Sequence, residues 1–197
     1  MATDLDGIFN VGLNGCRDRA IFDKWLEELK KMNMSKARYL KANGEYAEEE
    51  GDWEYTIGGF GGEEPEEDEE DFPYCVRFDG PYMFKIILMD DISQIPSFYR
   101  LYILFQPPYF FDEFITEVKL VLRIFGATEL IWLSSIGSAS YSEIYQLYVW
   151  GNTPYPKVKE ILINKFGQPL DYAGAKEYAE KTSWSYSTLD KFVLDKI

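Results

Sequence analysis

Hydrophobic residues recur along this chain with two different periods, which predict helices in some segments and strands in others. Three segments have apolar residues three and four positions apart, as on one face of a helix. The first starts near Asp18, the second runs from Phe111 to Phe125, and the third follows Pro156. A glycine directly after the second and third segments, Gly126 and Gly167, is a common helix end. We therefore expect three amphipathic helices in these places.

A further helical segment is predicted from Tyr172 to Leu194. Within it, Ser187 and Asp190 have the spacing of a capping box, in which a serine at the start of a helix pairs with an acid three residues later. We expect Phe192 and Val193 to lie in the helix that follows this box.

Short runs rich in β-branched and aromatic residues, bounded by glycine, proline or acids, are typical of strands. Such runs cover residues 53–57, 73–80, 81–89, 98–105, 129–136 and 143–150. Between the second and third runs, Asp79 and Gly80 form a dipeptide that favours a hairpin turn. We expect these runs to form the sheet of the protein.

The order of the segments predicts an α+β fold. From residue 72 onward, three strands precede a helix, two strands and two helices, and strands joined by short turns favour antiparallel pairing. We expect a largely antiparallel sheet of about five to six strands with helices packed on one face, plus an N-terminal helix and an acidic loop. We interpret residues 1–197 as a single domain with an acidic, partly flexible insertion at 44–71, because neither that loop nor the first helix is large enough for its own core.

The net negative charge of the chain lies in one segment. The sequence has 34 acidic and 20 basic residues, a formal charge of −14, and 14 of the acids lie between Lys41 and Arg77, where there is no base. Outside that segment, 20 acids face 20 bases. A localised charge can attract a charged partner over a distance, whereas dispersed charge mainly favours solubility.

Aromatic residues are interleaved with these acids, a composition suited to protein contacts because carboxylates attract a basic partner and aromatic rings bury area against it. We expect residues 45–57 to be ordered and to make specific contacts, and residues 63–71 to be mobile because they have nothing apolar to bury. The predicted partner-binding residues are Glu48, Glu49, Glu50, Asp52, Trp53, Glu54, Tyr55, Glu63, Glu64, Glu66, Glu67, Asp68, Glu69, Glu70 and Asp71.

These features favour a non-enzymatic acidic inhibitor that binds and blocks a basic protein, such as a nuclease, a toxin or a nucleic-acid-handling defence complex. The analogy is with bacterial immunity proteins and phage anti-defence proteins, whose carboxylates take the place of phosphates on the target. Direct nucleic-acid binding is disfavoured, because the bases are scattered and the acids repel phosphate. The sequence leaves the oligomeric state open. A viral structural or assembly protein, with aromatic contacts between copies, is a further alternative.

Carboxylate chemistry is the enzymatic alternative, because the chain has no histidine for a catalytic triad or an imidazole metal site. Over four residues, Asp4 to Gly7 resembles the aspartate motif of haloacid-dehalogenase-type phosphotransferases. Asp90 and Asp91 follow a predicted strand and resemble the acidic motif of sugar-nucleotide glycosyltransferases, which implies a Mg²⁺ or Mn²⁺ site and an enzyme acting on a sugar nucleotide or phosphate ester. Polar turns explain both motifs more simply, and we expect no metal or cofactor.

The sequence also bears on the cellular compartment. No apolar run reaches the roughly 18 to 20 residues of a membrane span, and the first ten residues lack the basic and apolar regions of a secretory signal. We therefore expect a cytoplasmic protein without a membrane partner. In that setting Cys16 and Cys75 are expected to be reduced thiols.

Overall fold

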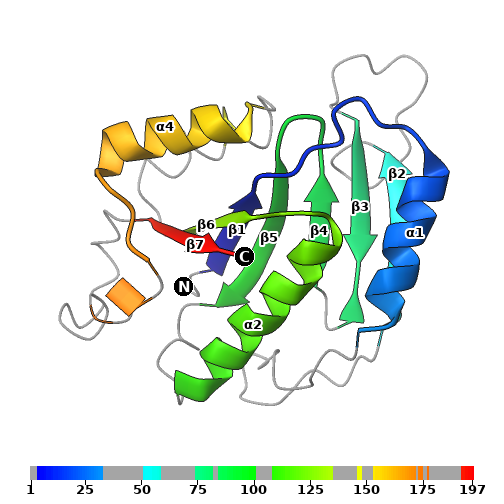
Figure 1. Cartoon of the computed structure of the whole chain (residues 1–197), viewed down its shortest axis with the longest axis horizontal. Coiled ribbons are helices and arrows are strands. Elements are labelled where there is room, and N and C mark those ends of the chain that lie inside the picture. The colour runs from blue at the N-terminus through cyan, green and yellow to red at the C-terminus, as the bar shows by residue number, and fades with distance from the viewer. Residues whose placement is uncertain are drawn as a thin grey trace.

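A computed structural model describes residues 4–32, 51–58, 74–81, 84–100, 108–134, 146–147, 153–171, 173–174, 177 and 192–197. Within these residues, seven strands form one antiparallel sheet in the order β2-β3-β4-β5-β1-β6-β7 (Figure 1). The strands are β1 (Asp4–Phe9), β2 (Glu54–Gly58), β3 (Cys75–Asp79), β4 (Lys85–Leu88), β5 (Ser93–Arg100), β6 (Glu129–Ser134) and β7 (Val193–Lys196). The expected α+β class is confirmed, with seven strands rather than five or six.

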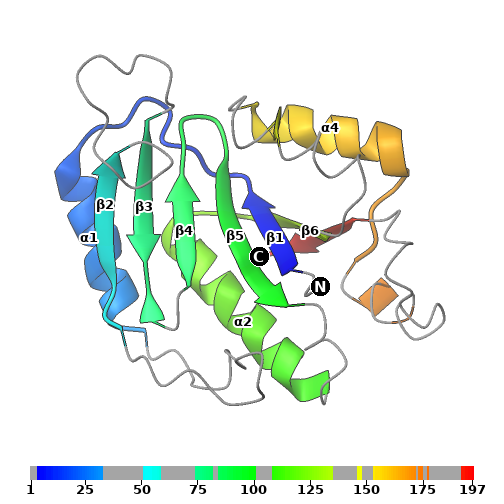
Figure 2. The ribbon, with the colours of Figure 1, turned by 180° about the vertical axis from the view of Figure 1, so that it is seen from behind.

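Helices cover both faces of this sheet. They are α1 (Arg19–Lys30), α2 (Pro108–Ile124) and α4 (Tyr155–Phe166). Phe9 and Val76 belong to the buried cluster that includes α1 and α2, whereas their neighbours Ile8 and Cys75 belong to the cluster under α4. Because successive residues of a strand point to opposite faces, α4 packs on the face opposite α1 and α2. Figure 2 shows α1 and α2 together behind the sheet. The expectation of helices on one face therefore holds for α1 and α2 but not for α4.

The helix ends follow the predicted signals. Asp18 precedes α1, and its side chain accepts a hydrogen bond from the backbone N–H of Ala20 at 3.0 Å, as expected of an N-cap residue. Gly126 after α2 and Gly167 after α4 have φ angles of +85° and +79°, which side chains with a Cβ rarely adopt. The three helices near Asp18, in 111–125 and after Pro156 are thus confirmed.

Two strands lie where the sequence predicted other structures. The prediction of a polar turn at Asp4 to Gly7 was wrong, because these residues belong to β1. This strand lies between β5 and β6 in the middle of the sheet. The helix predicted from Tyr172 to Leu194 was wrong over Val193 and Leu194, because these two residues belong to β7. This strand pairs with β6. Both strands are held by partners far away in the sequence, so no local pattern indicates them.

Of the remaining strand predictions, four agree with the structure and two differ from it or lie partly outside the described residues. β2, β3, β4 and β6 lie within the predicted runs or one residue beyond them. β5 starts at Ser93, five residues before the predicted run 98–105, and residues 101–105 lie outside the described residues. Gln146 and Leu147 lie in a helical turn rather than in the strand predicted for 143–150, whose other residues are not described.

Aromatic rings hold α1 and α2 against the sheet. The Trp25 ring of α1 lies 5.3 Å from the ring of Phe125 and 6.4 Å from that of Phe78 on β3, both edge to face. Phe78 and Phe125 are themselves 5.4 Å apart. Such pairs add to the burial of apolar area in stabilising a core. In the part of the chain that is described, no helix combines the length and the apolar character of a membrane span.

Candidate functional site

The acidic segment is joined to the two ends of strand β2. At one end, Gly58 is the last residue of β2 and pairs with Cys75, the first residue of β3. At the other end, the chain enters β2 through Gly51, Asp52 and Trp53. Four steps along a strand span about 13 Å. The acids of 45–54 and those of 63–71 are therefore attached to opposite ends of one short edge strand.

Four of the predicted partner-binding residues are described. Asp52 and Glu54 are exposed, Tyr55 is half-buried, and Trp53 is only 2% exposed. The others lie outside the described residues, namely Glu48, Glu49, Glu50, Glu63, Glu64, Glu66, Glu67, Asp68, Glu69, Glu70 and Asp71. The described part of the predicted surface thus presents two carboxylates to solvent.

Trp53 lies in the core. Its ring packs edge to face against Phe84 at 6.0 Å and covers the backbone of Gly80. A Cβ atom at Gly80 would lie only 2.6 Å from the indole ring, so the turn after β3 needs glycine because of this close approach. The structure thus places Trp53 in the core, and a contact between Trp53 and a partner stays a prediction.

Tyr55 connects β2 to α1. Its hydroxyl donates a hydrogen bond to Oδ1 of Asp23 at 2.8 Å, and its ring packs 6.0 Å from that of Phe22 and 5.6 Å from that of Phe78. Burial raises the pKa of Tyr55, and the hydrogen bond to Asp23 raises it further. These contacts give Tyr55 a structural role at the sheet edge, with its ring directed at the helix.

Asp90, one of the two acids considered as metal ligands, is paired with Arg17. The guanidinium donates to Oδ1 at 2.9 Å and to Oδ2 at 3.0 Å, and the N–H of Gly15 donates to Oδ1 at 3.1 Å. The hydrogen bond from Arg17 lowers the pKa of Asp90, against the opposing effect of burial. Arg17 also stacks over the ring of Tyr74, with 3.6 Å between the guanidinium carbon and the ring centroid.

This pairing occupies the oxygens that a cation would need. Asp91, the second acid of the motif, is exposed at the rim of the pocket described below. Asp4 and Asp6, the acids of the other motif, lie in β1, where Asp6 is 4% exposed. Across the described ranges, no three metal-ligating side chains of the Cys, Asp or Glu type come together.

We expect Asp90→Asn to lower the free energy of unfolding by about 1 kcal/mol or less at neutral pH, since solvent screens this partly exposed pair. The pKa of Asp90 is lower in the folded than in the unfolded state, so its contribution is complete above the ordinary carboxylate pKa of about 4 and is lost as the pH falls through the folded-state pKa. Urea unfolding of wild type and variant at several pH values measures this difference.

The matched control is Arg17→Gln, which removes the other half of the same pair. The double variant should lose less stability than the sum of the two single variants, because the Arg17–Asp90 pair can be broken only once, whereas the Arg17–Tyr74 and Gly15–Asp90 contacts are lost separately. If the stability difference between wild type and Asp90→Asn stayed constant down to acid pH, the result would contradict a stabilising pair between Asp90 and Arg17.

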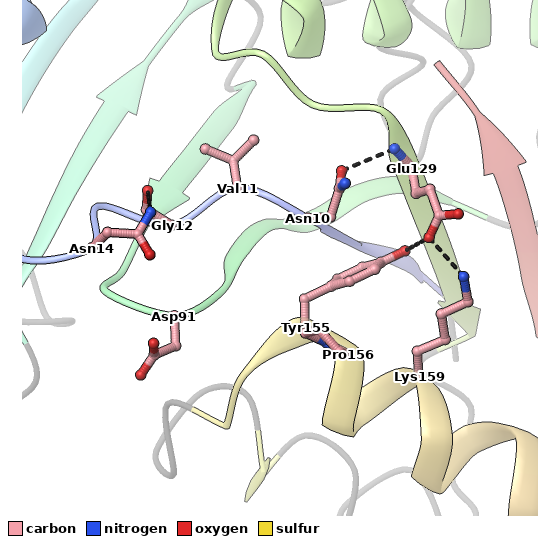
Figure 3. Close-up of a pocket in the computed structure, with 9 residues that line it drawn as sticks. All are labelled: Asn10, Val11, Gly12, Asn14, Asp91, Glu129, Tyr155, Pro156 and Lys159. Atoms are coloured by element: carbon pink, nitrogen blue, oxygen red, sulfur yellow. Dashed lines mark hydrogen bonds and ion pairs between the residues drawn. The ribbon is translucent and has the colours of Figure 1, made fainter.

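A pocket of about 380 Å³ lies between the connection from β1 to α1, the start of β6 and the first turn of α4 (Figure 3). It was not predicted, because its residues are far apart in the sequence and form no motif. The lining residues are Asn10, Val11, Gly12, Asn14, Asp91, Glu129, Tyr155, Pro156 and Lys159.

Most polar groups of the pocket bind one another. Glu129 Oε2 accepts from Lys159 Nζ at 2.7 Å and from the Tyr155 hydroxyl at 3.3 Å, and Glu129 Oε1 contacts the ammonium of Lys196. Burial alone would raise the pKa of Glu129, but the hydrogen bonds from the two ammonium groups outweigh it and lower that pKa. Burial raises the pKa of Tyr155. A carboxylate held charged by two cations and a tyrosine held neutral are poorly matched to proton transfer near neutral pH.

Asn10 completes this network. Its side-chain oxygen accepts from the backbone N–H groups of Thr128 and Glu129, each at 2.9 Å, and its amide donates to the Thr128 hydroxyl at 2.7 Å. Asn10 thereby fixes the start of β6 beside β1, and Glu129 ties β6 to α4 and β7. We interpret the pocket as a place where elements are joined rather than as a catalytic centre.

No protein-family model, no curated protein and no solved structure matches this chain.

Proposed function

We propose that this protein is a non-enzymatic acidic inhibitor that binds and blocks a basic protein, such as a nuclease, a toxin or a nucleic-acid-handling defence complex. One observation carries the proposal: the whole net charge of −14 resides in a segment without a base, and the two halves of that segment are joined to opposite ends of an edge strand. A partner with a basic groove could meet carboxylates from both ends of β2.

Two described carboxylates near β2 differ from three that lie elsewhere in the fold. Asp52 and Glu54 are exposed and form no ion pair with any residue that the structure describes. By contrast, Asp90, Glu129 and Asp195 are paired with Arg17, Lys159 and Lys119. The charge around β2 is thus not compensated within the described fold, which leaves it available to attract a basic protein over about one Debye length, roughly 10 Å at 0.1 M salt.

The alternatives have less support. A divalent-metal enzyme acting on a sugar nucleotide or phosphate ester would use Asp90 and Asp91, yet both oxygens of Asp90 already accept hydrogen bonds from Arg17. A viral structural or assembly role would use exposed aromatic rings, and among the described residues Trp53 and Phe78 have their rings buried in the core.

Affinity capture from cells that naturally contain the protein, followed by mass spectrometry, would identify the partner. We then expect a variant with the eight acids of 63–71 replaced by glutamine or asparagine to bind it at least about tenfold more weakly at low salt, because the long-range attraction is lost. The two affinities should converge as salt rises.

The matched control exchanges glutamate and aspartate within 63–71, which preserves the charge while changing every acidic side chain. This control should bind like the wild type. Equal affinities of the wild type and the neutral variant at low salt would count against the proposed function.

A further inference from the structure

We propose that the outer edge of β2 binds an extended basic segment of the partner, which adds to the described sheet as a further strand. This inference rests on the proposed function and specifies how the partner is held. Adding a strand to a sheet edge supplies main-chain hydrogen bonds for affinity, while side chains on the added strand provide selectivity.

The two edges of the sheet differ. On the outer side of β7, the N–H of Leu170 donates to the carbonyl of Phe192 at 3.0 Å, and the N–H of Leu194 donates to the carbonyl of Leu170 at 2.9 Å. That edge is therefore paired with Leu170 at Val193, over part of its length. β2 lies at the opposite end of the sheet (Figure 1), and none of the described residues pairs with its outer side.

β2 lacks three features that help to prevent edge pairing in natural sheets, namely proline, lysine and a bulge. The sequence of β2 is EYTIG, with neither proline nor lysine, and its five residues pair in unbroken register with five residues of β3. Tyr55 and Ile57 pack against the core on one face, which anchors β2 at the end of the sheet.

Charge selects the kind of strand that fits. Glu54 is exposed at the start of β2, and Asp52 precedes it. On the inner side, Glu54 is opposite Asp79, which is itself held by Arg77 at 2.6 Å. A lysine or arginine on an added strand would lie about 5 Å from Glu54 and meet an uncompensated carboxylate. A second copy of this chain would instead bring two acidic segments together, so repulsion disfavours pairing between copies.

The probe for this inference is a synthetic peptide of about seven residues that alternates lysine and valine, long enough to cover β2. We expect it to bind the full-length protein at low salt and to slow amide hydrogen exchange at alternate residues of 54–58, those whose N–H groups point away from β3. The amide of Leu194 in β7 should be unaffected, because it already donates to the carbonyl of Leu170.

The matched control peptide has the same sequence and charge but carries N-methyl groups on alternate amides, which removes its donors toward β2. It should bind at least about tenfold more weakly, since several main-chain hydrogen bonds are lost. A variant with Asp52→Asn and Glu54→Gln should also bind the unmethylated peptide more weakly.

The outcomes separate the two proposals. Binding of both peptides with equal affinity and no protection in β2 would overturn the edge inference while leaving a purely electrostatic acidic binder intact. Absence of binding by either peptide at low salt would contradict both the edge inference and the proposed function.

Discussion

Replacing Trp53 by alanine is expected to lower the free energy of unfolding by about 3–5 kcal/mol, as for other large core aromatics. The indole is 2% exposed, packs against Phe84 and covers Gly80, so truncation leaves a cavity between these residues. Urea or thermal unfolding of the purified variant measures the loss. The matched control is Glu54→Ala. Glu54 follows Trp53 in the chain and its side chain is exposed, so this substitution should change the free energy of unfolding by less than about 0.5 kcal/mol.

The same variant tests whether Trp53 is a core residue or a docking anchor. Under conditions where Trp53→Ala remains folded, it should bind the basic partner about as well as the wild type. A variant as stable as the wild type but deficient in binding would place Trp53 at the interface and contradict its assignment to the core.

Gly12→Ala is expected to destabilise the fold by about 3 kcal/mol or more, at the upper end for an added core methyl group. A Cβ at Gly12 would lie 2.9 Å from the carbonyl carbon of Asp90, and closer still to its oxygen. The clash is with backbone, so no rotamer change relieves it. Two hydrogen bonds hold these segments together: Leu13 N–H donates to the Met89 carbonyl at 2.7 Å and Asn14 N–H to the Asp90 carbonyl at 2.9 Å.

Gly15→Ala is the control for this steric effect. Gly15 has a φ of +77°, but a Cβ there would meet nothing within 4 Å, so only backbone strain of about 1–2 kcal/mol is expected. Chemical denaturation of both variants in parallel compares them directly. If Gly12→Ala proved less destabilising than Gly15→Ala, that result would contradict the close approach of the loop after β1 to the backbone of Asp90.

The helices and the hairpin strands could be predicted because their signals are local. Asp18, Gly126 and Gly167 act through backbone geometry within one turn of the helix they bound, so the residue types suffice. β3 and β4 have dense apolar runs next to a turn. β1 has only Leu5, Ile8 and Phe9 as apolar residues, and it becomes a strand because β5 and β6 pair with it on both sides.

The candidate site was predictable in its charge and not in its contacts. Counting acids located the acidic segment between Lys41 and Arg77. Composition does not tell which way a ring beside β2 points, so Trp53 was expected to contact a partner. Arg17 lies 73 residues from Asp90, and Lys196 lies 67 residues from Glu129. Pairings at such separations depend on the assembled sheet, and no spacing rule in the sequence indicates them.

The most direct measurement is the association rate constant between this protein and its captured partner, followed by stopped-flow across a salt series. For the wild type we predict a rate that approaches about 10⁸ M⁻¹s⁻¹ at low salt and falls at least about tenfold by 0.5 M salt. The neutral 63–71 variant should associate more slowly and with a weaker salt dependence than the wild type, because only the acids of 45–54 remain in the segment. A wild-type rate that matched the neutral variant at every salt concentration would contradict a function based on this acidic segment.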